Sequence, residues 1–224
     1  LILSIFVIFI FANSQIEEYI YDVEIKGISM IAGNVGKCNL KIKKNKNNEY
    51  EMDIVTKTTR FAKILYPYVD EIKLKINNYF SLLSIEQNSS NRKQKLKINV
   101  DKNNKTITKN GQILNFYADT LFSPYSLIHF LRKKELIVNN KYNYKIFDGG
   151  KIKNILLEVS KIEKIKVPYG KFECLHIKPI IGKDAIKNNG LIELWYTNNE
   201  EKIPIKIKLD TKIGTFIMKL KKIN

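Results

Sequence analysis

The chain has 224 residues, enough for one domain of ordinary size or two small ones and too few for a large multidomain enzyme. Hydrophobic residues make up 44% of it, including 11% aromatic residues, and there are 10 Gly and 5 Pro, which excludes collagen-like, disulfide-scaffold and generally disordered chains. A chain of this size buries roughly 70% of its unfolded surface, so it needs neither a disulfide nor a metal to fold.

The formal net charge of +17 would by itself favour an anionic partner such as nucleic acid. However, only Arg60, Arg92 and Arg132 are arginines, and recognition of phosphates and base edges favours the planar guanidinium. The lysines are scattered, and apolar residues interrupt their densest runs at strand spacing, which is typical of the solvated face of a sheet. We therefore expect no nucleic-acid partner.

The N-terminal segment has the form of a secretory signal peptide. Residues 1–11 are almost entirely apolar, and the small residues Ala12 and Ser14 stand at positions minus three and minus one of a cut after Ser14. Eleven helical residues span about 16 Å, well short of a bilayer core of about 30 Å, so cleavage is expected rather than anchoring. The sequence predicts a signal at residues 1–14, whose start is expected to be truncated because the sequence opens on Leu. A single β-rich domain is predicted at residues 15–224. We expect this domain to have no transmembrane segment and to be exported to the periplasm or cell envelope.

The N-terminal half of the mature chain alternates between apolar and polar residues with a period of two. This alternation is typical of strands with one buried face. Turn-forming residues at 45–48 separate two of the alternating runs and predict a hairpin. The predicted strands cover residues 19–25, 38–42, 50–54, 72–76 and 96–100, with a short strand around Ile107.

A helix is predicted over residues 123–134. Ser123 can cap it with its hydroxyl, and Pro124 suits the first helical position. An apolar stripe follows, and three basic residues ending at Lys134 suit the negative end of the helix dipole. A second, weaker helical turn is predicted at residues 61–65.

Strand patterns return after this helix and continue to the end of the chain. Short turns join most neighbouring strands, whereas parallel crossovers would need more helices than the sequence offers. The sequence therefore predicts a mainly β fold: a single curved antiparallel sheet, as a β-roll or half-barrel, with one or two covering helices. The additional predicted strands cover residues 143–147, 155–165, 172–177, 191–197, 203–209 and 215–220.

Two cysteines allow two interpretations. In an oxidising compartment Cys38 and Cys174 could form a disulfide that closes a long loop. Alternatively, each packs as a small hydrophobe. Cys174 and His176 lie two apart on a strand and so share a face, but zinc needs four ligands, and we predict no metal and no cofactor.

No catalytic constellation stands out, so we expect no enzyme. Ser126 precedes His129 by three residues on the predicted helix, which explains their adjacency without a nucleophile and base, and nothing indicates an oxyanion hole. Trp195 and Tyr196 place one aromatic ring on each side of their strand, and at least one is expected to anchor the core.

Several short motifs, in order, resemble the bacterial exported domain-of-unknown-function-3108 family. They are YDVEIKGI at 21–28, SPYSLIHFLR at 123–132, FDGGK at 147–151, VPYGKFEC at 167–174, LWYT at 194–197, IPIK at 203–206 and IG at 213–214. The resemblance implies an envelope protein with a rolled antiparallel sheet, more distantly similar to the carriers that ferry lipoproteins across the periplasm, and no established reaction. The family tends to have Asp where Ser123 stands and an acidic turn where Asn198 and Asn199 stand, so roles of those acids do not carry over.

Four residues fall on motif positions of this resemblance. We expect Arg132 and Asp148 to pair and hold the helix end against a turn. We expect Trp195 to plug the roll and Pro204 to lie on an edge strand.

Two functions follow from the sequence. The favoured one is a non-catalytic envelope binding module, in which the curved sheet and the helix enclose an apolar groove for a lipid acyl chain or an extended peptide. The alternative is a structural or assembly factor that engages proteins or anionic cell-wall polymers through a lysine-rich face.

Overall fold

The computed structural model describes residues 16–26, 33–90, 95–148, 150–180, 191–211 and 214–224. The predicted signal at residues 1–14 lies outside them. The elements, in chain order, are β1 (Ile16–Lys26), β2 (Gly33–Lys44), β3 (Tyr50–Thr58), α1 (Arg60–Leu65), β4 (Val69–Ile76), β5 (Leu82–Ser89), β6 (Leu96–Asp101), β7 (Thr106–Lys109), β8 (Gln112–Asn115), α2 (Pro124–Leu131), β9 (Lys141–Asp148), β10 (Lys151–Val167), β11 (Gly170–Pro179), β12 (Leu191–Thr197), β13 (Pro204–Thr211) and β14 (Gly214–Ile223).

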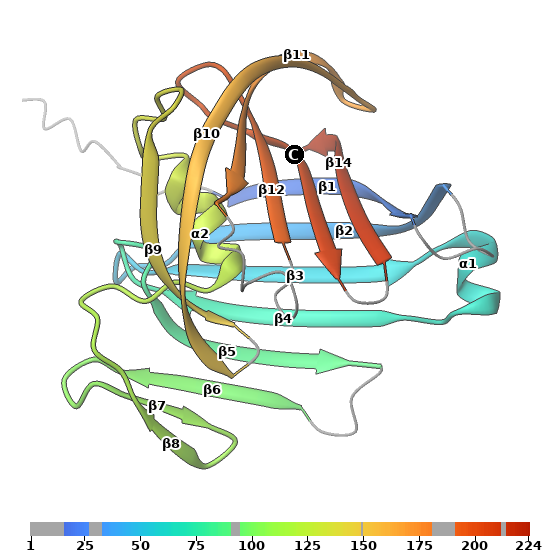
Figure 1. Cartoon of the computed structure of the whole chain (residues 1–224). Helices are drawn as coiled ribbons and strands as arrows, with labels where there is room; N and C mark the ends of the chain where they lie inside the picture. The colour runs from blue at the N-terminus through green and yellow to red at the C-terminus, as the bar shows by residue number, and fades with distance from the viewer. Residues whose placement is uncertain (1–15, 27–32, 91–94, 149, 181–190, 212–213) are drawn as a thin grey trace, which may run out of the picture.

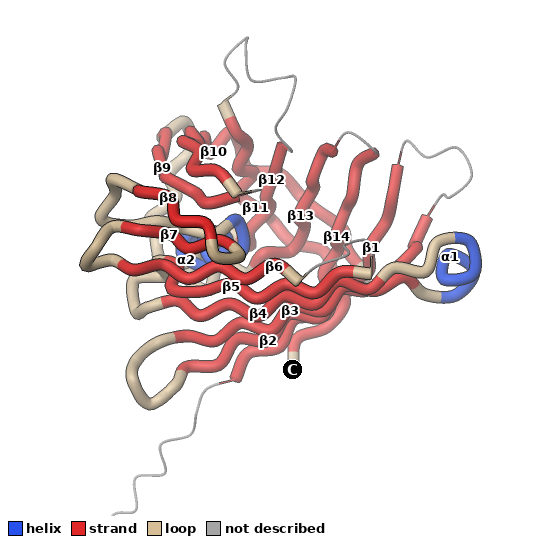
Figure 2. The backbone as a smooth tube through the Cα atoms, turned by 90° about the horizontal axis from the view of Figure 1, so that it is seen from below, coloured by secondary structure: helices blue, strands red, loops and turns tan. Residues whose placement is uncertain are grey.

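All fourteen strands form one antiparallel sheet in the order β8-β7-β6-β5-β4-β3-β2-β1-β14-β13-β12-β11-β10-β9. Every neighbouring pair is consecutive in the chain except β1 and β14, so the two ends of the sequence meet in the middle of the sheet. The sheet curls without closing, and β8 and β9 are its two edges (Figures 1 and 2). The predicted fold class is confirmed.

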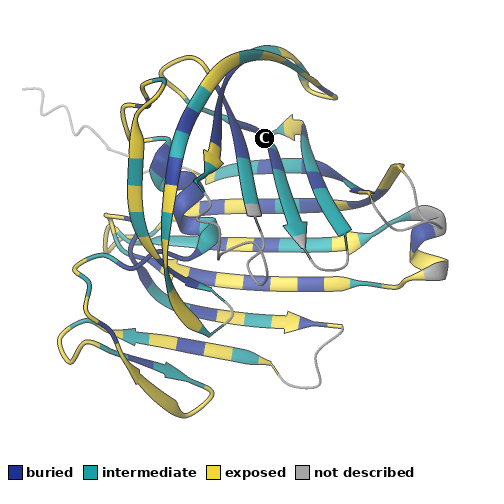
Figure 3. Cartoon of the chain, viewed as in Figure 1, coloured by how far each residue is buried: buried dark blue, intermediate teal, exposed yellow. Residues whose placement is uncertain are grey.

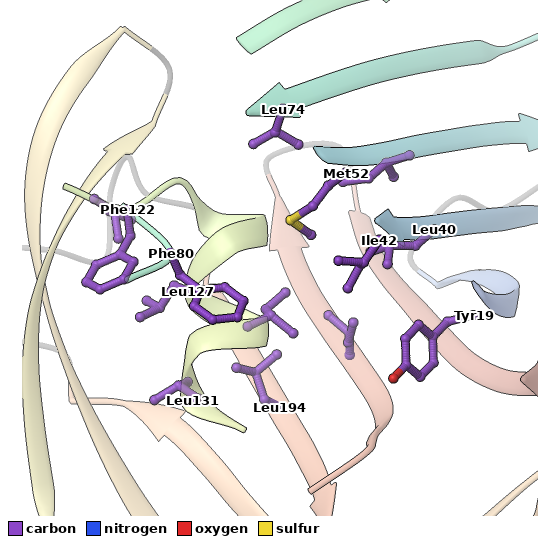
Figure 4. Packing of buried hydrophobic residues seen from close by; sticks show 14 of the residues in the cluster. Tyr19, Leu40, Ile42, Met52, Leu74, Phe80, Phe122, Leu127, Leu131 and Leu194 are labelled. Atoms are coloured by element: carbon purple, nitrogen blue, oxygen red, sulfur yellow. The ribbon is translucent and has the colours of Figure 1, made fainter. Parts of the chain in front are cut away.

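The core lies on the concave face of this sheet. β4 shows the cause most plainly, because its burial alternates strictly between exposed and buried residues along the strand. Parts of β2 and β3 show a similar alternation (Figure 3). Met52, Leu74 and Leu131 are at most 1% exposed, and α2 packs its apolar stripe into the curve of the sheet (Figure 4). The hollow of the roll is therefore filled by α2 and the side chains around it.

Two features hold α2 in place. Its capping is reciprocal: the Ser123 hydroxyl accepts from the Ser126 N–H, and the Ser126 hydroxyl accepts from the Ser123 N–H, each at 3.0 Å. The hydroxyl of Tyr196, on β12, donates to the Ile128 carbonyl at 2.8 Å. The predicted N-cap is thus confirmed, whereas the helix ends at Leu131, three residues before the predicted end.

Residues 116–122, which we call the strap, cross the gap between the two halves of the sheet. On one side the Leu82 N–H donates to the Leu121 carbonyl at 2.7 Å. On the other side Phe122 forms a parallel bridge with Ile146 on β9. The strap therefore links β5 to the opposite edge of the sheet where the sheet itself does not close.

Among the described residues, no helix has both the length and the apolar character needed to cross a membrane.

Candidate functional site

A groove of about 920 Å³ opens where the roll fails to close. It lies between the strap, the C-terminal end of α2 and the edge strand β9. Its lining residues are Tyr79, Lys105, Tyr117, Ala118, Asp119, Thr120, Phe122, Phe130, Lys134, Tyr142, Asn143, Tyr144 and Lys145. The sequence placed an apolar groove inside the concave face; the structure instead fills that face with α2 and leaves the open space beside it.

Three aromatic rings pack against one another along the groove. The Phe122 and Phe130 centroids are 4.7 Å apart, and Tyr144 meets both rings edge-on, at interplanar angles of 84° and 87°. Edge-to-face contacts of this kind hold rings in fixed orientations. Burial raises the pKa of Tyr144 to about 12, so its phenol is neutral. The groove thus has a preformed aromatic floor.

The rim of the groove is more exposed to solvent than its floor, and it is positively charged. Tyr79 and Tyr117 are 69% and 78% exposed. The Lys134 ammonium lies 4.9 Å from the Phe130 ring centroid, and the Lys145 ammonium donates to the Tyr117 carbonyl at 2.8 Å. With Lys105 there are three lysines and one aspartate in the lining, which leaves an excess of positive charge.

A partly buried polar cluster joins α2 to the start of β1. Arg132 donates to the Glu17 carboxylate at 2.7 Å and to the Glu201 carbonyl at 3.2 Å, and its guanidinium lies 5.6 Å from the Tyr19 ring centroid. Burial acts to raise the pKa of Glu17, but hydrogen bonds from Tyr19 and Arg132 outweigh it and leave that pKa below its ordinary value. This pair fastens the helix end to the sheet.

His129 lies beside this cluster and is neutral. Burial lowers its pKa to about 3, and the nearby Arg132 charge acts in the same direction. Its Nδ1 atom has no hydrogen-bond partner among the described residues. The Ser126 hydroxyl is used by the helix cap and donates to the Ser123 carbonyl, so the structure gives no nucleophile–base pair here.

Another polar cluster lies on the convex side of the sheet. His176 stacks on Trp195 with centroids 4.3 Å apart, and the Lys206 ammonium lies 4.0 Å from the Trp195 ring centroid. Trp195 donates to Glu163 at 2.7 Å, and His176 is 2.8 Å from Glu193. Burial lowers the pKa of His176 even though both carboxylates oppose that shift. The Trp195 N–H and the His176 Nε2 atom are thus hydrogen-bonded, whereas the buried His176 Nδ1 atom lies 3.5 Å from Glu163 and has no hydrogen-bond partner among the described residues.

The structure corrects the roles predicted for the four motif positions. Arg132 does not meet Asp148, whose carboxylate accepts from Lys153 at 2.7 Å. Trp195 lies on the convex face, because its neighbours Leu194 and Tyr196 face α2, so Tyr196 plugs the roll in its place.

Pro204 is the fourth of these positions, and it lies on an internal strand rather than an edge strand. It begins β13, which runs between β12 and β14. Proline is tolerated at the first residue of a strand, and here its carbonyl accepts from the Tyr21 hydroxyl at 3.0 Å.

The predicted disulfide is not formed in the structure. Cys38 on β2 and Cys174 on β11 are free thiols with four strands between them, and both are buried. Burial raises the pKa of each to about 11, which leaves them protonated. Within the described ranges, no three His, Cys, Asp or Glu side chains are grouped closely enough to hold a metal ion.

Comparison with known proteins identifies the family of this chain. A family model described as "Protein of unknown function (DUF3108)" matches residues 21–221. The chain belongs to the DUF3108 family. The resemblance carried by its sequence motifs is therefore confirmed. A comparison with curated proteins finds no match.

Solved structures show a similar fold to this DUF3108 chain at low sequence identity. The beta-barrel-like protein of domain of unknown function DUF1849 from Brucella abortus has a TM-score of 0.60 and 10% identity, covering 93% of this chain and 97% of its own. A DUF1089 family protein from Pseudomonas aeruginosa has a TM-score of 0.41 and 12% identity, covering 80% of this chain and 92% of its own. The first of these supports the fold alone.

Proposed function

We propose that this DUF3108 chain is a non-catalytic, exported envelope protein that binds a lipid or another apolar ligand in the groove beside α2. The observation that carries the proposal is the preformed aromatic floor, open to the surface, in a groove of about 920 Å³. Ligand sites typically have volumes of about 300–1,000 Å³ and a mainly apolar lining. The signal-like residues 1–14 support export.

The residues that line the groove support binding rather than catalysis. As far as the structure describes them, they include no Ser, Cys or His, and their ionisable groups are three lysines, one aspartate and tyrosines. Lysines beside rings attract negative charge, and neutral phenols donate hydrogen bonds. Such a lining can hold and orient a ligand without reacting with it.

The test is binding of the dye 1-anilinonaphthalene-8-sulfonate, which has an aromatic body and an anionic sulfonate. Its fluorescence reports binding to the parent protein and to the double variant Tyr79→Ala/Tyr117→Ala. Both rings are largely exposed, so their removal leaves the core intact. Two lost aromatic contacts should weaken binding about tenfold. Tyr169→Ala is the matched control, because that ring stacks on Phe172 at the β10–β11 turn. Equal affinity of the double variant and the parent contradicts the proposal.

A second candidate is an assembly factor that binds anionic polymers through the convex face. Lys37 on β2 lies directly opposite Lys57 on β3, and both are exposed. On the other side of Lys37 lies Asp22 of β1, whose carboxylate is paired with Lys221. Like charges in this position repel each other, and a bound polyanion relieves that repulsion. Retention on immobilised cell-wall polymer that falls steeply with added salt would favour this candidate, whereas dye binding, which also rests on aromatic contacts, should fall less steeply.

A further inference from the structure

The edge of β9, rather than one of its faces, borders the groove. Four consecutive residues of this strand, 142–145, belong to the lining. Side chains along a strand alternate between two faces, so an unbroken run of residues borders a groove only where the strand's edge is turned toward it. β9 ends the sheet, and this side of the strand has no neighbouring strand in the sheet.

Hydrogen bonds to the strap identify the peptide groups of β9 that face the groove. The Phe122 N–H donates to the Lys145 carbonyl at 3.0 Å, and the Phe147 N–H donates to the Phe122 carbonyl at 2.7 Å. Because peptide groups along a strand point alternately to opposite sides, the odd-numbered residues of β9 face the strap and the even-numbered ones pair with β10. Asn143 therefore turns both its N–H and its carbonyl toward the groove.

The ladder between strap and β9 stops after this single bridge. In the described structure, residues 117–120 of the strap and residues 142–145 of β9 line the groove without backbone hydrogen bonds between them, although the Lys145 side chain reaches the Tyr117 carbonyl. Within the part of the chain that the structure describes, the N–H and carbonyl of Asn143 and the N–H of Lys145 have no backbone partner. Three hydrogen-bonding groups thus lie beside an aromatic floor.

We propose that this edge binds an extended peptide segment of another protein, which adds to β9 as a further strand. The inference rests on the proposed function and names its ligand. An acyl chain would cover the rings but would leave the Asn143 and Lys145 peptide groups without partners as it excludes water. A peptide backbone supplies both carbonyl and N–H groups at the spacing that β9 requires, and its alternate side chains reach the rings.

Charge selects the kind of peptide. Lys105, Lys134 and Lys145 line the groove against one carboxylate, Asp119, so acidic side chains complement it. An alternating segment presents apolar residues on one face, toward Phe130 and its neighbouring rings, and acidic residues on the other. The partner segment is therefore extended, with alternating apolar and acidic residues.

The first experiment uses a synthetic six-residue peptide of alternating Glu and Val with blocked ends, about 20 Å long when extended, to displace the dye from the full chain. The matched peptides carry Lys in place of Glu, or N-methyl groups on one or the other set of alternate amides. We expect roughly tenfold weaker displacement by the Lys peptide, and by one N-methylated peptide but not the other, because an added strand bonds to β9 along one side only. Equal displacement by all four peptides overturns the inference.

The second experiment changes the protein. Asn143→Pro removes the N–H that faces the groove and leaves the ladder with β10 intact, and proline is compatible with an edge strand. Asn143→Ala removes the same side chain and keeps the N–H. We expect peptide binding to be at least fivefold weaker for Asn143→Pro than for Asn143→Ala, because both variants lose the same side chain and only the first loses the N–H. Equal loss in both variants contradicts a backbone contact, and if the proline variant fails to fold, the N-methylated peptides decide.

Dodecanoate separates this inference from the proposed function. If the peptide displaces the dye and Asn143→Pro weakens that displacement, the inference holds. If dodecanoate displaces the dye and the peptide does not, the inference fails while binding of an apolar ligand stands. If the dye itself is insensitive to loss of Tyr79 and Tyr117, the proposed function fails together with the inference.

Discussion

Acid should destabilise this protein well before its carboxylates titrate, because His129 is buried as a neutral ring. The chain has two histidines, so the effect can be assigned to a residue. His129 is 2% exposed, and its pKa falls from 6.5 to about 3 on burial. The unfolded chain therefore binds a proton at mildly acidic pH that the folded chain excludes. The stability that comes from keeping His129 neutral is present in full above about pH 6.5 and is lost as the pH falls from there toward 3.

The size of the loss follows from the two pKa values. At pH 5 the unfolded histidine is almost fully protonated and the folded one is not, which lowers the free energy of unfolding by about 2 kcal/mol relative to pH 7.5. This figure depends on the unfolded pKa, and it holds for any folded pKa well below 5. Burial also lowers the pKa of His176, so that residue adds a smaller loss of the same sign.

Urea unfolding at pH 7.5, 6 and 5 measures this loss directly. His129→Phe keeps a ring beside Tyr19, 5.9 Å away in the parent, and removes the titrating group. His176→Gln is the matched control. We expect the His129→Phe variant to lose about 2 kcal/mol less than the parent between pH 7.5 and 5, and the control to lose nearly as much as the parent. A parent that loses under 0.5 kcal/mol, or a Phe variant with the same loss as the parent, refutes the reasoning.

Three further substitutions test the packing around α2 by the same urea measurement. Tyr196→Phe removes the hydroxyl that donates to the Ile128 carbonyl and should cost about 1–2 kcal/mol; no change would show that water replaces the bond. Leu131→Ala, at a residue that is 0% exposed, should cost about 2–5 kcal/mol, whereas a loss below 1 would mean that the site collapses freely. Glu17→Gln should cost only about 1 kcal/mol, because solvent screens a carboxylate that is 36% exposed; a cost above 3 would indicate a dry ion pair.

Much of the fold follows from local patterns in the sequence. Strict alternation of apolar and polar residues predicted β4, and the sequence Ser-Pro predicted the start of α2. In each case the signal lies within the element's own residues: the buried face of the strand and the cap of the helix. β5 was missed: its sequence LLSIEQNS begins with adjacent leucines and ends in polar residues, so no period of two is visible. β8 was missed because all four of its residues are exposed and none marks a buried face.

The candidate site could not be predicted in the same way. Arg132 meets Glu17, 115 positions away, and no local pattern distinguishes that partner from Asp148. The groove brings together rings from the β4–β5 turn, the strap, α2 and β9, segments that only the curling of the whole sheet places side by side. Tyr142 and Tyr144 lie two apart in the sequence, which indicates one face of a strand. Nothing in the sequence indicated that the edge of this strand would remain open.

The order of strands explains why the open edge lies at the groove. Because β1 pairs with β14, the two edges of the sheet fall on β8 and β9, which come from the middle of the chain. Proteins blunt exposed edges by shortening or covering them, and both devices occur here: β8 has four residues, and Phe122 of the strap covers β9 at Ile146. The cover stops before Asn143, at the point where the rings and lysines gather. An edge that is covered at Ile146 and left open at Asn143, beside the rings and lysines, is better explained by a binding partner than by incomplete closure of the roll.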